Sequence, residues 1–87
     1  MSSLAKKIKG DPKAVEVFFT DTQFCIRLAD GREIRSPLEY YSRLKNATKQ
    51  QRDNYKLIGQ GEGIHWPDLD EDLSVQGILL GLPVVNW

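Results

Sequence analysis

The chain has 87 residues, of which 40% are apolar and 28% charged, and its formal net charge is zero. This length and composition predict one small globular domain and exclude extended disorder, because enough apolar surface is present to form a core. A single cysteine excludes an intrachain disulfide. No apolar run reaches the roughly 20 residues of a membrane-spanning helix, and the N-terminus has no apolar signal segment, so we expect a cytoplasmic protein without membrane association.

Charge is distributed unevenly along the chain. All twelve Lys and Arg residues lie between Lys6 and Lys56, where seven acidic residues accompany them, whereas residues 57–87 hold five acidic residues and no Lys or Arg. Such asymmetry favours a charged partner. The alternative is that the two ends of the chain pack together and neutralise each other.

The N-terminal residues 1–13 are polar and basic and include the helix breaker Gly10-Asp11-Pro12. We expect a flexible basic arm here, followed by a single domain over residues 14–82. The last residues, 83–87, predict an apolar tail.

Three segments after the arm, 14–19, 23–28 and 32–35, alternate apolar and polar residues at the period of a β-strand. The Asp30-Gly31 pair between the last two segments is typical of a tight hairpin turn, because both residues tolerate positive φ. The fold class predicted is therefore α+β, beginning with an antiparallel β-meander of three strands.

The same alternation predicts which side chains of these strands are buried. Val15, Val17 and Phe19 share one face of the first strand. In the second strand, Cys25 lies on the face opposite to the apolar one. We expect it to be a small half-buried filler and not a reactive thiol, because no partner base is near it in sequence.

The period then changes to that of a helix. Residues 36–39, Ser-Pro-Leu-Glu, form a helix start signal, which predicts a helix over 37–46. Thr48 as cap and Gln51 at the third helical position repeat the signal and predict a second short helix over 49–54.

The two helices form a basic pair. Its five cationic side chains are Arg43, Lys45, Lys49, Arg52 and Lys56. With tyrosines nearby, they are the candidate nucleic-acid-binding residues. The alternative is a solvated helix face, since phosphate binding is usually accompanied by a net positive domain.

Residues 55–58 and 63–66 predict a β-hairpin joined by a glycine-rich turn. Asp68, with Glu71 three residues later, resembles a capping pair and predicts a buried C-terminal helix over 68–80. Gly77 inside it indicates close approach to another backbone.

The segment 65–72 gathers the residues with chemical potential. These are His65, Trp66, Asp68, Asp70, Glu71 and Asp72. A calcium loop is excluded, because its required glycine and glutamate are replaced by Leu73 and Leu79, and zinc would need more His or Cys ligands. A metal-dependent hydrolase that uses these carboxylates and His65 is the remaining enzymatic alternative.

A structural interpretation of this segment is that Trp66 anchors the core or its rim, His65 is a hydrogen-bonded packing residue and the carboxylates begin a helix. A functional interpretation is an acidic contact surface for a basic partner, formed by segment 65–72 with Trp87 of the tail. We expect no enzyme and no cofactor or metal.

Several motifs resemble the bacterial domain-of-unknown-function family 2442 over about residues 12–82. They are Val15-x-Val17-x-Phe19, Asp30-Gly31-Arg32, Pro37-Leu38-x-Tyr40-Tyr41-x-x-Leu44, Ala47-Thr48, and Gly63-Ile64-His65-Trp66-Pro67-x-Leu69-Asp70-Glu71-Asp72-x-Ser74-Val75-x-Gly77-Ile78-Leu79. The resemblance implies a small α+β domain without established activity or catalytic residues. It further implies a gene beside that of another small protein, with this family as the antitoxin-like member of a toxin–antitoxin pair.

The leading hypothesis is therefore a non-enzymatic protein-interaction module that binds the product of a neighbouring gene, a basic toxin in this interpretation. Nucleic-acid binding through the basic helical pair and metal-dependent hydrolysis at segment 65–72 are the alternatives.

Overall fold

The structure, a computed structural model, describes residues 12–81 and contains six strands and four short helical elements in that range. In chain order they are β1 (Ala14–Phe19), β2 (Gln23–Leu28), β3 (Glu33–Pro37), the 3-10 helix η1 (Leu38–Tyr40), α2 (Ser42–Lys45), α3 (Lys49–Asp53), β4 (Lys56–Ile58), β5 (Gly63–Trp66), β6 (Glu71–Ser74) and α4 (Val75–Leu79). The basic arm (except Pro12 and Lys13) and the apolar tail with Trp87 lie outside the described residues. No helix of the described part is long and apolar enough to cross a membrane.

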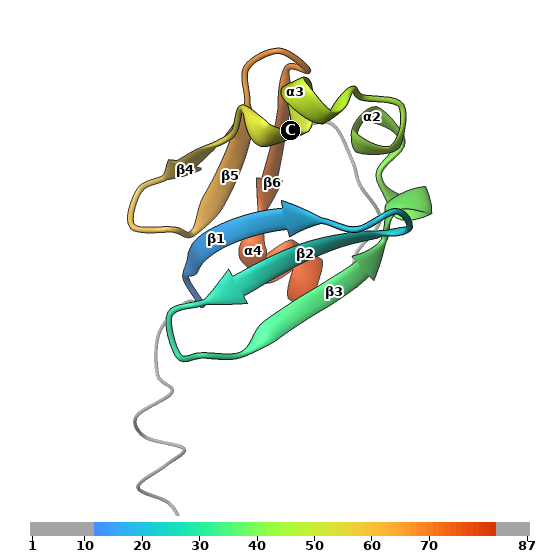
Figure 1. Cartoon of the computed structure of the whole chain (residues 1–87). Coiled ribbons are helices and arrows are strands. Elements are labelled where there is room, and N and C mark those ends of the chain that lie inside the picture. Colours follow the sequence, from blue (N-terminus) through green and yellow to red (C-terminus); the bar gives the residue numbers. More distant parts are fainter. Residues whose placement is uncertain (1–11, 82–87) are drawn as a thin grey trace, which may run out of the picture.

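The strands form two antiparallel sheets of three strands each, sheet A in the order β1-β2-β3 and sheet B in the order β4-β5-β6. Figure 1 shows sheet B standing over the β1 side of sheet A, with α2 and α3 beside one end of sheet B. The α+β class and the three-stranded meander are confirmed. The predicted hairpin of β4 and β5 is also present, and it is extended by β6.

The inner face of β1 differs from the prediction. The register of β1 against β2 shifts between Ala14 and Glu16, which is a β-bulge. Because an extra residue reverses the alternation of side chains, Ala14 and Val17 are buried, whereas Val15 is 53% exposed. The expectation that Val15 lies on the inner face is therefore wrong, while Val17 and Phe19 do pack on the core.

The helix predicted over 37–46 is shorter and broken. Ser36 pairs with Phe24 of β2, so it continues β3 and does not cap a helix. The backbone then forms the single turn η1, leaves helical geometry at Tyr41 (φ −131°, ψ 82°) and enters α2. Tertiary strand pairing here overrides a local start signal.

The second helix start is confirmed at α3. The Thr48 hydroxyl accepts from the Gln51 amide at 3.1 Å, and the Gln51 side chain accepts from the Thr48 amide at 2.9 Å. This capping box satisfies two N–H groups at the helix start.

The helix predicted over 68–80 is wrong over its first half. Residues 67–70 form a turn, and the next four residues form strand β6, which pairs with β5. Within the predicted range only α4 is helical. The Ser74 hydroxyl caps this helix by accepting from the Gly77 amide at 3.0 Å. Glu71 and Leu73 are buried and Asp72 is exposed, so this segment has the two-residue period of a strand.

The close backbone approach lies at Gly61 and not at Gly77. At Gly77 an added Cβ would meet only the capping hydroxyl of Ser74. Gly61 has φ +106°, and its added Cβ would lie against the backbone of Ala14, whose amide donates to the Gly61 carbonyl at 2.7 Å. This contact joins the two sheets.

The core lies between the sheets and is centred on Trp66, which is fully buried. Phe24 packs edge-on against both Trp66 and Tyr41, with ring centroids 5.7 and 5.2 Å apart. The Trp66 indole N–H donates to the Arg52 carbonyl at 3.1 Å, so the polar atom of this large side chain is satisfied. The prediction of Trp66 as a structural anchor is confirmed.

Candidate functional site

Three exposed carboxylates form what we call the acidic turn: Asp68 and Asp70 in the connection between β5 and β6, and Asp72 on β6 directly after it. Figure 1 shows this connection at the end of sheet B that lies beside α3. Asp68 accepts from the side-chain amide of Asn54 at 3.0 Å, and Asp72 contacts the His65 ring nitrogen Nδ1. Asp70 has a left-handed backbone with φ 50°, a conformation that Asp tolerates better than most residues.

No Lys or Arg of the described residues forms an ion pair with the acidic turn. Between the basic and acidic parts of the described chain, the ion pairs are Lys13 with Glu62 at 3.0 Å and Arg43 with Glu71 at 3.9 Å. Packing therefore neutralises two of the five acidic residues after position 56. The charge asymmetry of the sequence survives folding at the acidic turn.

Two of the predicted contact residues are buried and face the core. Trp66 is 0% exposed and Glu71 is 5% exposed. Burial raises the pKa of the Glu71 carboxyl, an effect that the Arg43 guanidinium partly opposes. Arg43 also donates to the Asp70 carbonyl at 2.7 Å, so this pair holds the base of the acidic turn, with Glu71 buried and the Arg43 side chain 45% exposed.

His65 lies on the outer face of sheet B in a row across the three strands. The register places it between Lys56 on β4 and Asp72 on β6. Its ring is about one-third exposed, and the contact with Asp72 confirms the hydrogen bond expected for it. His65 thus orients one carboxylate of the acidic turn.

The metal-binding arrangement considered from sequence is not assembled. Within residues 12–81 no three His, Cys, Asp or Glu side chains are grouped so that they could hold a metal ion. Glu71 is turned into the core and Asp68 is held by Asn54, so neither converges with His65. The side chains of segment 65–72 provide no local metal centre.

The basic helical pair is largely engaged within the molecule. Arg52 donates to the carbonyls of Leu44 and Lys45 at 2.8 and 3.0 Å, and its guanidinium lies 5.3 Å from the ring centroid of Phe19. Arg52 therefore closes the C-terminal end of α2, and with it ties α3 to the core. Sequence reasoning missed this role, because helix capping by a residue on the next helix has no local signal.

The remaining members of the basic pair are on the surface. Lys45 pairs with Glu39 at 3.4 Å and Lys49 with Asp53 at 2.7 Å, while Lys56 is exposed on β4. Because Arg43 is directed to the acidic turn, four of the five cationic side chains have partners inside the domain.

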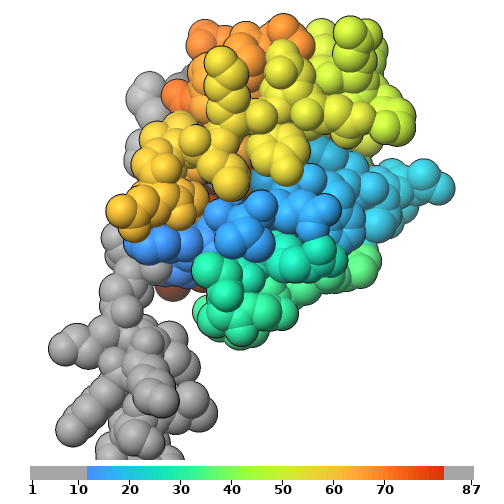
Figure 2. All heavy atoms as spheres, turned by 60° about the vertical axis from the view of Figure 1, so that its left-hand side comes forward, coloured from blue at the N-terminus to red at the C-terminus, as the bar shows by residue number. Residues whose placement is uncertain are grey.

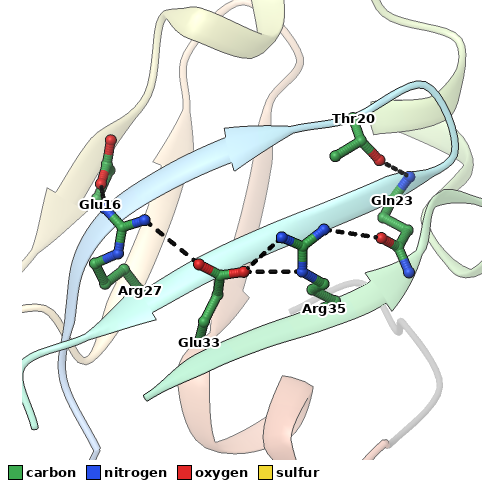
Figure 3. A network of polar contacts seen from close by, with 6 residues as sticks. All are labelled: Glu16, Thr20, Gln23, Arg27, Glu33 and Arg35. Atoms are coloured by element: carbon green, nitrogen blue, oxygen red, sulfur yellow. Dashed lines mark hydrogen bonds and ion pairs between the residues drawn. The ribbon is translucent and has the colours of Figure 1, made fainter. Parts of the chain in front are cut away.

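A polar network on the outer face of sheet A was also missed (Figure 3). It joins Glu16, Arg27, Glu33, Arg35, Gln23 and Thr20. Its two guanidinium groups, of Arg27 and Arg35, lie 5.5 and 6.0 Å from the ring centroid of Phe18. This layer covers Cys25, which is fully buried and not half-buried. Burial raises the pKa of its thiol, which is typical of a structural cysteine.

Solved structures support this fold. A protein of unknown function from Rhodospirillum rubrum ATCC 11170 is 26% identical, with a TM-score of 0.74 over 88% of this chain and 95% of that chain. An uncharacterized protein from Chromobacterium violaceum, solved by NMR, is 21% identical, with a TM-score of 0.72 over 97% of this chain and 76% of that chain, and is similar in fold.

No curated protein matches the chain. The family model described as "Protein of unknown function (DUF2442)" matches residues 14–83, which include both sheets and the acidic turn. The chain therefore belongs to the DUF2442 family.

Proposed function

We propose that the domain is a non-enzymatic protein-interaction module whose acidic turn binds a basic protein partner. The observation that carries the proposal is the exposure of Asp68, Asp70 and Asp72 without an ion pair to any Lys or Arg of the described residues. The finer form of the proposal is an antitoxin-like role, in which the partner is a basic toxin encoded by the neighbouring gene.

The surrounding contacts make the acidic turn suitable for recognition. Asn54 and His65 hold two of the carboxylates, and Arg43 holds the backbone of the turn from below. A surface whose side chains are already ordered loses less conformational entropy on binding. Exposed charges of one sign also accelerate encounter with an oppositely charged partner.

Co-expression with the product of the neighbouring gene tests the proposal. Co-purification of the two proteins, and rescue of growth if that product is toxic, are the expected results. Failure of the wild-type chain to form a complex, together with absence of rescue, contradicts the proposal.

A charge-matched pair of variants tests the surface. Asp68→Asn, Asp70→Asn and Asp72→Asn together remove three charges with little change in shape, and we expect them to weaken the complex. Asp21→Asn, Asp30→Asn and Glu39→Gln remove the same charge from exposed sites elsewhere and should leave it intact. Equal loss from both sets would show a non-specific charge effect and exclude the acidic turn.

Nucleic-acid binding through the basic helical pair is the competing function. It has weaker support, because four of its five cationic side chains have partners inside the domain. A gel shift at two salt concentrations separates the cases, since binding to phosphates weakens steeply as salt rises. Absence of a shift at low salt removes this function.

A further inference from the structure

Strand β4 is an open edge of sheet B. It pairs with β5 on one side, and no strand of residues 12–81 pairs with its other side. All three of its residues are exposed, and they include two large apolar side chains, Leu57 at 37% and Ile58 at 46%. An exposed apolar edge is a template for pairing with another chain.

The other sheet edges carry protection that β4 lacks. β3 has Glu33, Arg35 and Pro37, and β6 has the charged residues Glu71 and Asp72. β1 has its bulge and two contacts with the segment around β4. Charges, proline, bulges and short strand length are the usual means by which edges avoid pairing. On β4 these are Lys56 and the length of three residues, while its other two residues are exposed and apolar.

Val15 is a further exposed apolar side chain, and it lies on β1, which contacts the segment around β4. The Ala14 amide donates to the Gly61 carbonyl and the Val17 amide donates to the Tyr55 hydroxyl at 3.2 Å, so β1 runs past residues 55–61. Figure 2 shows β1 lying against the β4 hairpin on the face turned forward there. We call Val15, Leu57 and Ile58 the β4 edge patch.

We propose that a second copy of this chain covers the β4 edge patch by antiparallel pairing of the two β4 strands about a two-fold axis at Leu57. A two-fold interface must be self-complementary, and this register meets that requirement. Leu57 lies opposite Leu57 of the second copy, and Lys56 lies opposite Ile58, so no like charges face each other.

The same register continues the apolar face of sheet B. Leu57 is opposite Ile64, and Ile64 is opposite Leu73, and the latter two are buried. Residues opposite each other in a sheet share a face. Pairing at Leu57 therefore joins two such rows into one apolar row across six strands. On the other face, the aliphatic stem of Lys56 covers Ile58, while its ammonium remains in water.

Light scattering after gel filtration, over the micromolar to millimolar range, tests the proposal on the full chain. The wild type should show a concentration-dependent mass that approaches a dimer. Leu57→Lys should raise the dimer dissociation constant at least about tenfold, because two leucines lose their contact and two ammonium groups face each other. Leu80→Lys is the matched control, since Leu80 is an exposed leucine outside the patch, and it should dimerise as the wild type does.

A cysteine scan tests the register independently of stability. Leu57→Cys places two thiols opposite each other at a separation that a disulfide can span, so mild oxidation should give a covalent dimer. Ile58→Cys is equally close to the edge but lies opposite Lys56, and it should cross-link much less. Cys25 is fully buried and should not react.

A monomeric mass for the wild type throughout this range overturns the proposal. So does a dimer that Leu57→Lys leaves unchanged, or equal cross-linking at positions 57 and 58. The triple asparagine variant of the acidic turn should dimerise normally, so the result is separable from binding of the basic partner.

Discussion

At the scale of single residues, glycine is required where the two sheets meet. Gly61 combines a positive φ with direct contact to the backbone of Ala14. Gly31, in the hairpin between β2 and β3, also has positive φ, at +95°, but an added Cβ there meets nothing within 4 Å. A substitution at Gly31 therefore adds backbone strain alone, whereas a substitution at Gly61 adds both backbone strain and steric overlap.

Gly31→Ala should destabilise the domain by about 1 kcal/mol, the lower end of the cost of a left-handed non-glycine residue. Gly61→Ala should cost at least about 3 kcal/mol, because the Ala14 strand must also move away. Urea denaturation of both variants measures the difference. Equal losses at the two positions would contradict the close approach at Gly61.

Glu71 is the buried carboxyl beneath the acidic turn, and its pKa is raised by burial. A raised folded pKa means that the protonated form favours folding: this contribution is full below the unfolded pKa, near 4.5, and is lost as pH rises through the folded pKa. Glu71→Gln keeps the shape and never ionises. The substitution should therefore be more favourable relative to wild type at pH 7 than at pH 4.

Urea denaturation at the two pH values checks this expectation, and Asp53→Asn on the exposed face of α3 is the control for general charge effects. The contrary result is that Glu71→Gln is as favourable relative to wild type at pH 4 as at pH 7, or more so. In that case burial does not set the pKa of the Glu71 carboxyl.

At the scale of elements, the two ends of the chain differ in how far sequence predicts them. The meander follows from alternation and from the Asp30-Gly31 turn, which are local signals that agree with the tertiary pairing. The Thr48 capping box is equally local and correct. The bulge that exposes Val15 has no such local signal, and it adjoins the long-range hydrogen bond between Ala14 and Gly61.

The last helix was misassigned because a local signal competed with a distant one. Asp68 and Glu71 have the spacing of a capping pair, but Glu71 and Leu73 alternate with Asp72 as a strand does. Pairing with β5 buries Leu73 beside Ile64, and this long-range gain decides the outcome. The sequence predicts these carboxylates at the start of a helix, whereas Asp68 and Asp70 lie in a turn and Asp72 lies on β6. The burial of Glu71 depends on the same unforeseen strand.

Arg52 links two elements, α2 and α3, and its loss should be structural. Arg52→Ala removes two charge-assisted hydrogen bonds to carbonyls and the contact with Phe19, so we expect a loss of about 1–3 kcal/mol. Lys49→Ala, which removes an exposed ion pair with Asp53, should cost no more than about 0.5 kcal/mol. Thermal denaturation compares them, and equal stability of the two variants would contradict the clamp role of Arg52.

At the scale of the whole molecule, the two surfaces proposed for binding both belong to sheet B of the described residues. The acidic turn lies at one end of sheet B, and the β4 edge patch lies along its open side. The row Lys56, His65 and Asp72 crosses the outer face of sheet B from β4 to the acidic turn, to which Asp72 belongs. The outer face of sheet A, in contrast, carries its own polar network.

Binding of a basic partner by the acidic turn is tested most directly by titration calorimetry. The product of the neighbouring gene is titrated into the wild type and into the triple asparagine variant of positions 68, 70 and 72, at low and high salt. The variant should bind at least about tenfold more weakly at low salt, and the difference should shrink at high salt because exposed charges are screened. Equal affinity of the two proteins at low salt would contradict the proposed function.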